Sequence, residues 1–149
     1  MVYTERKNIN RGYMKLEVWN DAIELFGMVY QNVSGTDGID FKPRNQIFDA
    51  AQSISANISE GYCRRTINEY LQFLNIALGS SGELMTRMIG LKKIRKISDE
   101  KFDAFDKFHY QVENKLLALI KALQTKRKDG VWEERIREPS VSYSAKRKR

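Results

Sequence analysis

The sequence predicts an all-α protein, an antiparallel up-down-up-down four-helix bundle. In four segments, apolar residues recur at alternating spacings of three and four, as they do along one face of a helix. Helix start and stop signals separate these segments, and the links between them are short, so consecutive helices should lie antiparallel. We expect the bundle to span residues 14–128, between an N-terminal arm (1–13) and a basic, flexible C-terminal tail (129–149).

The first helix is predicted over residues 14–34. Its stripe consists of Leu16, Trp19, Ile23, Phe26, Tyr30 and Val33. The run Ser34-Gly35-Thr36-Asp37-Gly38 should end this helix, because glycines and small polar residues favour a turn.

The second helix should begin near Pro43, since proline is favoured in the first turn of a helix, and end near Gly61. Its stripe consists of Ile47, Ala51, Ile54 and Ile58.

The third helix should begin at the capping-box sequence Thr66-Ile67-Asn68-Glu69 and run to about residue 96. Its stripe consists of Tyr70, Leu74, Ala77, Ser81, Leu84, Met88 and Leu91. Interior glycines cost about 1 kcal/mol each relative to alanine. The run Gly79-Ser80-Ser81-Gly82 therefore predicts that the backbone of a neighbouring helix comes close there.

The fourth helix should be capped by Ser98, with Asp99 and Glu100 in its first turn. Its stripe consists of Phe102, Phe105, His109, Val112, Leu116, Leu119 and Leu123, and Lys126-Arg127-Lys128 closes it before Gly130. Further apolar residues flank the four stripes: Val18, Ala22, Met28, Val29, Phe48, Phe73, Leu78, Phe108, Leu117 and Ile120. They indicate either a second apolar surface, at which the chain associates with itself, or simply a broad core.

Catalytic chemistry is not predicted. A di-metal site in a bundle needs Glu-x-x-His pairs, and His109, the single histidine, has no glutamate three residues before it. His109 lies in the apolar stripe and is expected to pack in the core, while Cys63 is expected to be a bystander thiol in a turn. Phosphate loops, CxxC pairs and dinucleotide fingerprints are absent from the sequence. We therefore predict no catalytic residue, cofactor or metal.

The location in the cell is predicted from three absences. The sequence has no apolar run of membrane-spanning length and no secretory signal, and its one cysteine cannot form an internal disulfide. Together these features predict a cytoplasmic protein that does not enter a membrane.

Positive charge is concentrated near the C-terminus. Residues 126–149 carry nine Lys or Arg and four acidic residues, which accounts for +5 of the formal net charge of +7. Such an end is typical either of a protein that binds a phosphate backbone or of a solvated tail. The candidate nucleic-acid-binding residues are Arg64, Arg65, Lys92, Lys93, Arg95, Lys96, Lys126, Arg127, Lys128, Lys146, Arg147, Lys148 and Arg149. For Lys92 to Lys96, compensation of the helix dipole explains the charge equally well. Arg6, Lys7, Arg11 and Lys15 make the N-terminal arm basic as well.

The segments "KLEVWNDAIEL" (15–25) and "QIFDAAQSISANISEGYCRRTINEYLQFLNIALGSSGEL" (46–84) resemble the bacterial 23S rRNA intervening-sequence protein family, whose members are called four helix bundle proteins. The resemblance covers residues 14–125 and implies a bundle that assembles as a ring, a homopentamer, with no catalytic residues. The resemblance extends to a relative of this family, the accessory protein of diversity-generating retroelements, which binds nucleic acid and a reverse transcriptase. RNA or DNA and a reverse transcriptase are thus implied partners. Members often carry two arginines where this chain has Phe48 and Asp49, which removes positive charge from the second helix.

Two functions therefore remain open, a non-enzymatic homo-oligomer that binds RNA or DNA and a scaffold that binds protein alone. The second helix also carries a polar stripe, which we interpret as structural and not as part of either function. Ser53, Asn57 and Glu60 share one face, and we predict that they form a hydrogen-bonded clasp that fixes this helix against the third.

Overall fold

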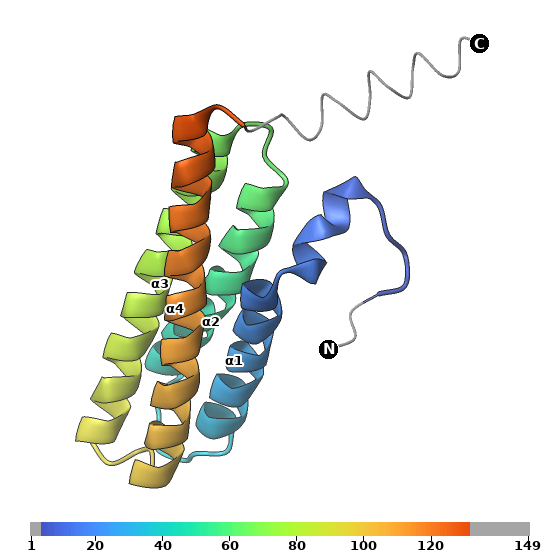
Figure 1. The fold of residues 1–149 in the computed structure, drawn as a ribbon. Helices are drawn as coiled ribbons and strands as arrows, with labels where there is room; N and C mark the ends of the chain where they lie inside the picture. The colour runs from blue at the N-terminus through green and yellow to red at the C-terminus, as the bar shows by residue number, and fades with distance from the viewer. Residues whose placement is uncertain (1–3, 132–149) are drawn as a thin grey trace.

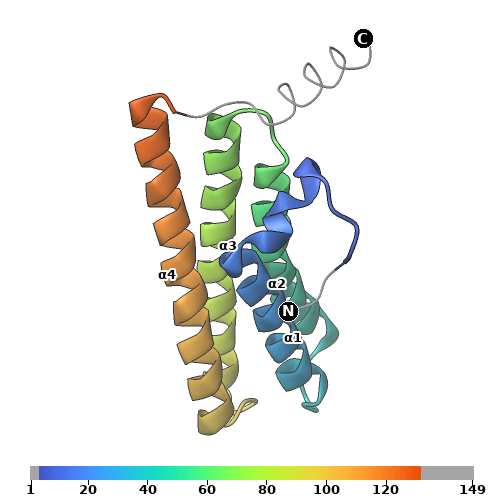
Figure 2. The ribbon, with the colours of Figure 1, turned by 45° about the vertical axis from the view of Figure 1, so that its right-hand side comes forward.

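The computed structural model describes residues 4–131 and contains, in this part of the chain, one 3-10 helix followed by four α-helices. They are η1 (Ile9–Lys15), α1 (Glu17–Ser34), α2 (Phe41–Tyr62), α3 (Ile67–Lys93) and α4 (Asp99–Asp129). Helices α1 and α3 each pack against α2 and α4, so the four long helices form a closed bundle. Figures 1 and 2 show the chain running in alternating directions through them. The predicted helical bundle is confirmed.

The N-termini of α3 and α4 are capped as predicted. Thr66 Oγ1 accepts a hydrogen bond from the Glu69 N–H at 3.2 Å, and Ser98 Oγ accepts one from the Lys101 N–H at 3.1 Å. In a capping box, the Glu69 carboxylate would accept a hydrogen bond from the backbone N–H of Thr66. In this structure it accepts one from the Thr66 hydroxyl instead, at 3.0 Å. The predicted ends of the helices shift slightly: α1 begins at Glu17 after η1, and α3 ends at Lys93.

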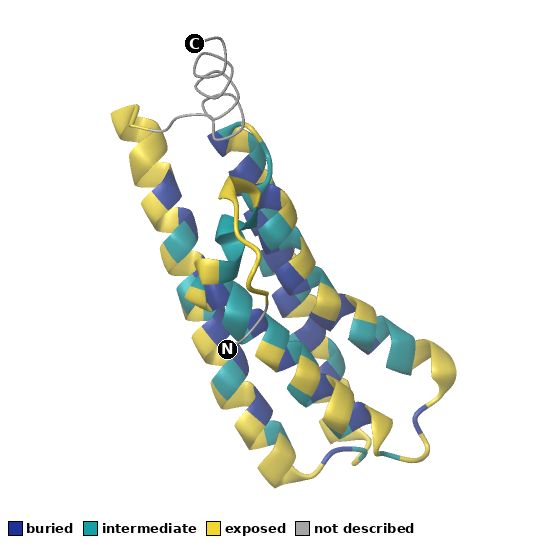
Figure 3. Ribbon diagram, turned by 90° about the vertical axis from the view of Figure 1, so that its right-hand side faces the viewer, coloured by how far each residue is buried: buried dark blue, intermediate teal, exposed yellow. Residues whose placement is uncertain are grey.

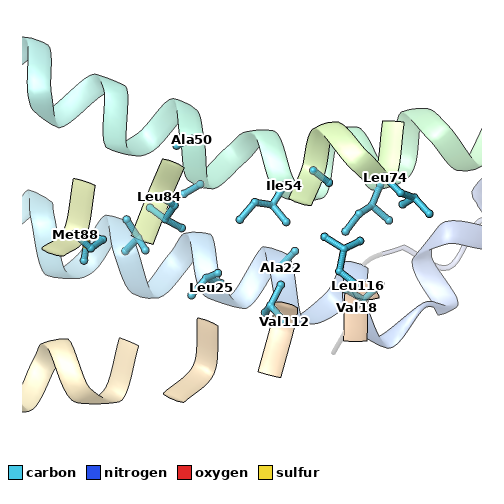
Figure 4. Close-up of a cluster of buried hydrophobic side chains, with 14 of the residues drawn as sticks. Val18, Ala22, Leu25, Ala50, Ile54, Leu74, Leu84, Met88, Val112 and Leu116 are labelled. Atoms are coloured by element: carbon cyan, nitrogen blue, oxygen red, sulfur yellow. The ribbon is translucent and has the colours of Figure 1, made fainter. Parts of the chain in front are cut away.

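Every residue of the predicted stripes on α2 and α3 is buried. Figure 4 shows Ile54, Leu84 and Val112 among the buried side chains that lie between the helices. The stripe on α4 is also buried at most positions, but Phe102 and Leu119 are half-buried while Ile120 enters the core. Figure 3 shows how the buried positions recur along each helix and leave an exposed face outside.

The predicted stripe on α1 is only partly correct, because Val33 is its one fully buried member. The buried residues of α1 are Val18, Ala22, Leu25, Val29 and Val33. Trp19 and Phe26 are only half-buried, and Tyr30 is 48% exposed. The helix carries two adjacent apolar stripes, and the bundle buries the one with smaller side chains, which lets α1 pack closely on α2 and α4. The aromatic stripe lies at the edge, where the Tyr30 ring centroid is 5.0 Å from that of Phe48 on α2.

Within the described chain, Gly79 and Gly82 do not make the predicted close approach to a neighbouring helix. A Cβ atom built on either glycine would meet nothing within 4 Å, and the same holds for Gly90. The close approach occurs instead at Gly61, where such a Cβ would lie 2.8 Å from Phe73 Cβ and 3.1 Å from the Tyr70 carbonyl oxygen. Gly61 therefore allows the end of α2 to pack on the first turns of α3.

Polar contacts also connect α4 to its neighbours. Lys115 Nζ lies 2.6 Å from Asp21 Oδ2 and 3.1 Å from Glu17 Oε1, which ties α4 to α1. The hydrogen bond that Lys115 donates to Asp21, followed by the one that it donates to Glu17, raises the pKa of Lys115 above its ordinary value. Its ammonium group is therefore charged at neutral pH.

Candidate nucleic-acid interface

The predicted basic residues form two groups at opposite ends of the bundle. Arg64 and Arg65 lie in the turn before α3, while Lys92 to Lys96 lie at its other end. The 27 residues of α3 span about 40 Å at a rise of 1.5 Å per residue. The structure therefore does not bring the two groups into one site. We call the end of the bundle with Arg64 and Arg65 the arm end, and the end with Lys92 to Lys96 the distal end.

The C-terminus of α4 joins Arg64 and Arg65 at the arm end. Arg127 Nη1 donates a hydrogen bond of 3.1 Å to Oδ1 of Asn68, in the first turn of α3. Lys126 and Lys128 flank it and are exposed. Gly130 ends the helix with φ of 69°, in the left-handed region that glycine adopts at little cost. Figure 1 shows the red end of α4 beside the green turn between α2 and α3.

The N-terminal segment lies at the same end. Tyr62 packs against η1 so closely that a Cβ atom on Gly12 would overlap its hydroxyl group, and Cys63 Sγ donates to the Asn10 carbonyl at 3.4 Å. A cleft of about 370 Å³ lies here, lined by Tyr62 and by basic residues of the segment. These are Arg6, Lys7, Arg11 and Lys15. Three parts of the chain that are far apart in the sequence thus place cations at one end.

Two contacts hold the Arg64 side chain. Its Nη2 lies 2.7 Å from Glu60 Oε2, and its guanidinium carbon lies 4.7 Å from the centroid of the Phe73 ring. Arg64 is therefore fixed against the surface of α2 and α3, whereas Arg65 next to it is exposed.

Contacts between aromatic rings support the arm end, and the sequence analysis did not predict these contacts. The ring centroids of Tyr13 and Tyr62 are 6.2 Å apart, and those of Tyr62 and Tyr70 are 5.9 Å apart. Tyr13 also contacts Trp19 at 5.2 Å. These rings come from η1, α1, α2 and α3, so no spacing in the sequence relates them. They hold the basic N-terminal segment against the bundle.

At the distal end, Lys92, Lys93, Arg95 and Lys96 surround a cleft of about 960 Å³ between the α1–α2 loop and the α3–α4 turn. Lys92 Nζ lies 4.7 Å from the centroid of the Phe102 ring. The remaining predicted cations, Lys146, Arg147, Lys148 and Arg149, lie outside the described residues.

Comparison with known proteins places the chain in a family. The family model described as "23S rRNA-intervening sequence protein" matches residues 14–118, which is most of the bundle. The chain belongs to the 23S rRNA-intervening sequence protein family. The resemblance seen in the sequence is thereby confirmed.

The fold of this family member also occurs in a solved structure. A crystal structure of a protein of unknown function from the S23 ribosomal protein family of Bacteroides thetaiotaomicron has 22% sequence identity and a TM-score of 0.66. The match covers 70% of this chain and 95% of that one, so it supports the bundle fold. No curated protein matches the chain. Neither the family description nor the name of the solved structure specifies a catalytic activity.

The polar stripe on α2 of this family member divides into two parts. Ser53 Oγ lies 2.7 Å from Ser80 Oγ on α3, and Asn57 Nδ2 donates to Ser53 Oγ at 2.8 Å. Glu60 pairs with Arg64 at 2.7 Å, and no hydrogen bond or ion pair of the described residues joins it to α3. The structure therefore brings together the Ser53, Asn57 and Ser80 side chains and leaves Glu60 outside. That Ser53 and Asn57 fix α2 against α3 stays a prediction.

His109 occupies the core position expected from its stripe. Its side chain is 1% exposed, and Nε2 donates to the Ser81 carbonyl oxygen on α3 at 2.8 Å. Nδ1 has no hydrogen-bond partner among the described residues, although Glu113 Oε1 is 3.4 Å away. Residues 4–131 contain no group of three or more His, Cys, Asp or Glu that could hold a metal ion, and no helix that could cross a membrane.

Proposed function

We propose that this chain is a non-enzymatic, homo-oligomeric protein of the bacterial cytoplasm that binds RNA or DNA through the phosphate backbone. The observation that carries the proposal is that η1 contacts the α2–α3 turn through Cys63, and the C-terminus of α4 contacts the first turn of α3 through Arg127. Residues 129–149, with four cations in their last four positions, follow from the same end of α4. A basic surface of this kind attracts phosphates without reading bases.

The charge at the arm end is largely available to an external anion. Among the described residues, no ion pair within 4.0 Å involves Lys126, Arg127 or Lys128, or the four cations of the N-terminal segment. Phosphate oxygens can therefore approach these groups without first displacing a carboxylate. Each phosphate contact releases condensed counterions, which makes the affinity fall as the salt concentration rises.

A gel-shift experiment tests the proposal. The full chain should retard a duplex of about 20 base pairs at 50 mM salt, and the affinity should fall by about 10²-fold or more at 200 mM if at least four phosphates are contacted. A chain truncated after Val131 should bind more weakly and with a smaller salt dependence, because the C-terminal cations are removed. Failure of the full chain to retard any RNA or DNA at 50 mM salt would refute nucleic-acid binding.

The exposed face of α3 supports the homo-oligomeric part of the proposal. Gly79, Gly82 and Gly90 lie on this face, and Ile76 and Ile89 on its borders are each 51% exposed. In an isolated chain each glycine costs about 1 kcal/mol of helix stability relative to alanine, and the described structure gives none of the three a close neighbour. A second copy packed on this face would explain the glycines, since their small size lets another backbone approach.

The Gly82→Ala variant tests whether this face of α3 is an interface between copies of the chain or is exposed to solvent. If a second copy packs there, the added methyl group should weaken self-association by about 10-fold or more, because overpacking a close contact costs about 1–3 kcal/mol. Analytical ultracentrifugation of the wild type and the variant measures the effect. Gly27→Ala is the matched control, because Gly27 also has no close neighbour but lies on α1. Equal self-association of both variants and the wild type would exclude this face as the interface.

A protein-binding scaffold is the second candidate, and an aromatic cluster favours it. The Phe26 and Tyr30 rings are 6.1 Å apart, Tyr30 and Phe48 are 5.0 Å apart, and Phe41 is 79% exposed. Through the resemblance, a reverse transcriptase is the protein partner that we propose for this surface. Capture of a reverse transcriptase that persists after nuclease treatment and is lost in Tyr30→Asp would support this candidate.

A further inference from the structure

We infer that the cleft at the distal end binds a phosphate or diphosphate group, at a site separate from the nucleic-acid interface of the arm end. Five cations line this cleft of about 960 Å³. They are Lys92, Lys93, Arg95, Lys96 and Lys101. The carboxylates that line it are those of Asp37 and Asp99. Its volume is in the range of small-molecule sites in proteins.

The cations of the distal cleft are not neutralised within the described part of the chain. No ion pair within 4.0 Å involves any of the five, although Asp37 and Asp99 line the same cleft. Several unpaired cations that converge on one concave surface repel one another, and a multivalent anion relieves that repulsion. Phosphate is such an anion, and lysine and arginine are the side chains that bind it in proteins.

Two parts of the fold hold the cleft together. Lys96 reaches from the α3–α4 turn to the α1–α2 loop, where a Cβ atom on Gly38 would overlap its side chain. Gly38 has φ of 84°, so the loop adopts here a backbone conformation that favours glycine. Lys92 is placed by its contact with the Phe102 ring on α4. The cations are thus presented by packed segments and not by one loose loop.

The backbone at Arg95 is the most informative feature of the cleft. Arg95 has φ of 59° and is the only residue other than glycine with a positive φ in the described chain. The Lys96 N–H donates to the Leu91 carbonyl at 2.8 Å, which is the contact that closes a Schellman motif, and glycine is the preferred residue at the left-handed position. Arginine costs stability there, and binding an anion through its guanidinium group accounts for its presence.

This site is independent of the proposed function, because Arg95 lies about 40 Å from the arm end along α3. Two sources carry the same chemistry, a free nucleotide such as ATP and the 5′-phosphate at the end of a nucleic acid. Their common group, a phosphate or diphosphate, is what the cleft is inferred to recognise.

The experiment follows the backbone amides of the full chain by NMR during titration with inorganic pyrophosphate. We expect saturable shifts at residues 92–101, and Arg95→Gly should weaken the affinity at least about 5-fold while Tm stays equal or rises, because glycine relieves the left-handed strain. Lys107→Gln is the charge-matched control and should bind pyrophosphate like the wild type. Parallel titrations with ATP and with short oligonucleotides that carry a 5′-phosphate or a 5′-hydroxyl distinguish the two sources.

Three results would overturn the inference: no saturable shifts at residues 92–101, equal shifts with sulfate at the same ionic strength, or unchanged affinity in Arg95→Gly. Its failure is distinguishable from that of the proposed function, because gel retardation by the arm end uses different residues. A variant that loses pyrophosphate binding and still retards a duplex would show two separate sites.

Discussion

Replacement of both Lys126 and Lys128 by glutamine is expected to weaken duplex binding about 30-fold at 50 mM salt, on the basis of roughly 1 kcal/mol for each lost phosphate contact. The plot of log K against log salt concentration should also become less steep by about 2, one unit for each cation removed. Both side chains are exposed and unpaired among the described residues, so the fold should be retained. Filter binding at several salt concentrations measures both quantities.

The control for this variant is the double replacement of Lys42 and Lys107 by glutamine. It removes the same charge from exposed positions outside the arm end, so it tests whether location matters beyond net charge. We expect its salt dependence to match that of the wild type. If the two double variants weaken binding equally, the arm end is not the interface and the attraction comes from overall charge alone.

Replacement of Gly61 by alanine is expected to lower the free energy of unfolding by about 2 kcal/mol, the middle of the range for overpacking a filled core. Helix propensity alone would predict the opposite sign, because Gly61 lies in the last turn of α2 and alanine is a better helix former than glycine. The added methyl group would meet Phe73 Cβ at 2.8 Å and the Tyr70 carbonyl oxygen at 3.1 Å. Neither atom can move without shifting the backbone of α3.

Gly27→Ala carries the same chemical change without the clash. Gly27 lies inside α1 and its Cβ position is open, so this variant should gain up to about 1 kcal/mol. Urea denaturation of both variants gives the comparison. A gain in stability for Gly61→Ala would mean that α2 and α3 are not held as closely at this point as the structure indicates.

Helix formation could be predicted well because its signals are local. The hydroxyl groups of Thr66 and Ser98 cap backbone N–H groups only three residues further along the chain. The stripes on α2 and α3 are also flanked by fewer apolar residues than the stripe on α1. On α1 two adjacent stripes satisfy the same spacing, so periodicity could not choose between them. The choice depends on the distance to α2 and α4, which favours Ala22 and Val29 over Trp19 and Phe26.

The candidate site could be predicted as a set of residues but not as an arrangement. Arg64, Arg127 and Lys92 all stand out in the sequence by charge. Only the packing of α4 beside the α2–α3 turn brings Arg127 to Asn68, while Lys92 lies at the other end. The aromatic contacts that hold η1 at the arm end, such as that of Tyr13 with Tyr62, have no signal in the sequence.

The sequence by itself determined that the chain forms helices, roughly where they begin and end, and that its positive charge is concentrated near the C-terminus. The tertiary structure alone decided which glycine packs closely against a neighbouring helix, which stripe of α1 is buried and which cations lie at the same end of the bundle. The physical reason is the range of the interactions involved. Capping and periodicity act within a few residues along the chain, whereas packing and charge convergence depend on residues that meet only after the helices assemble.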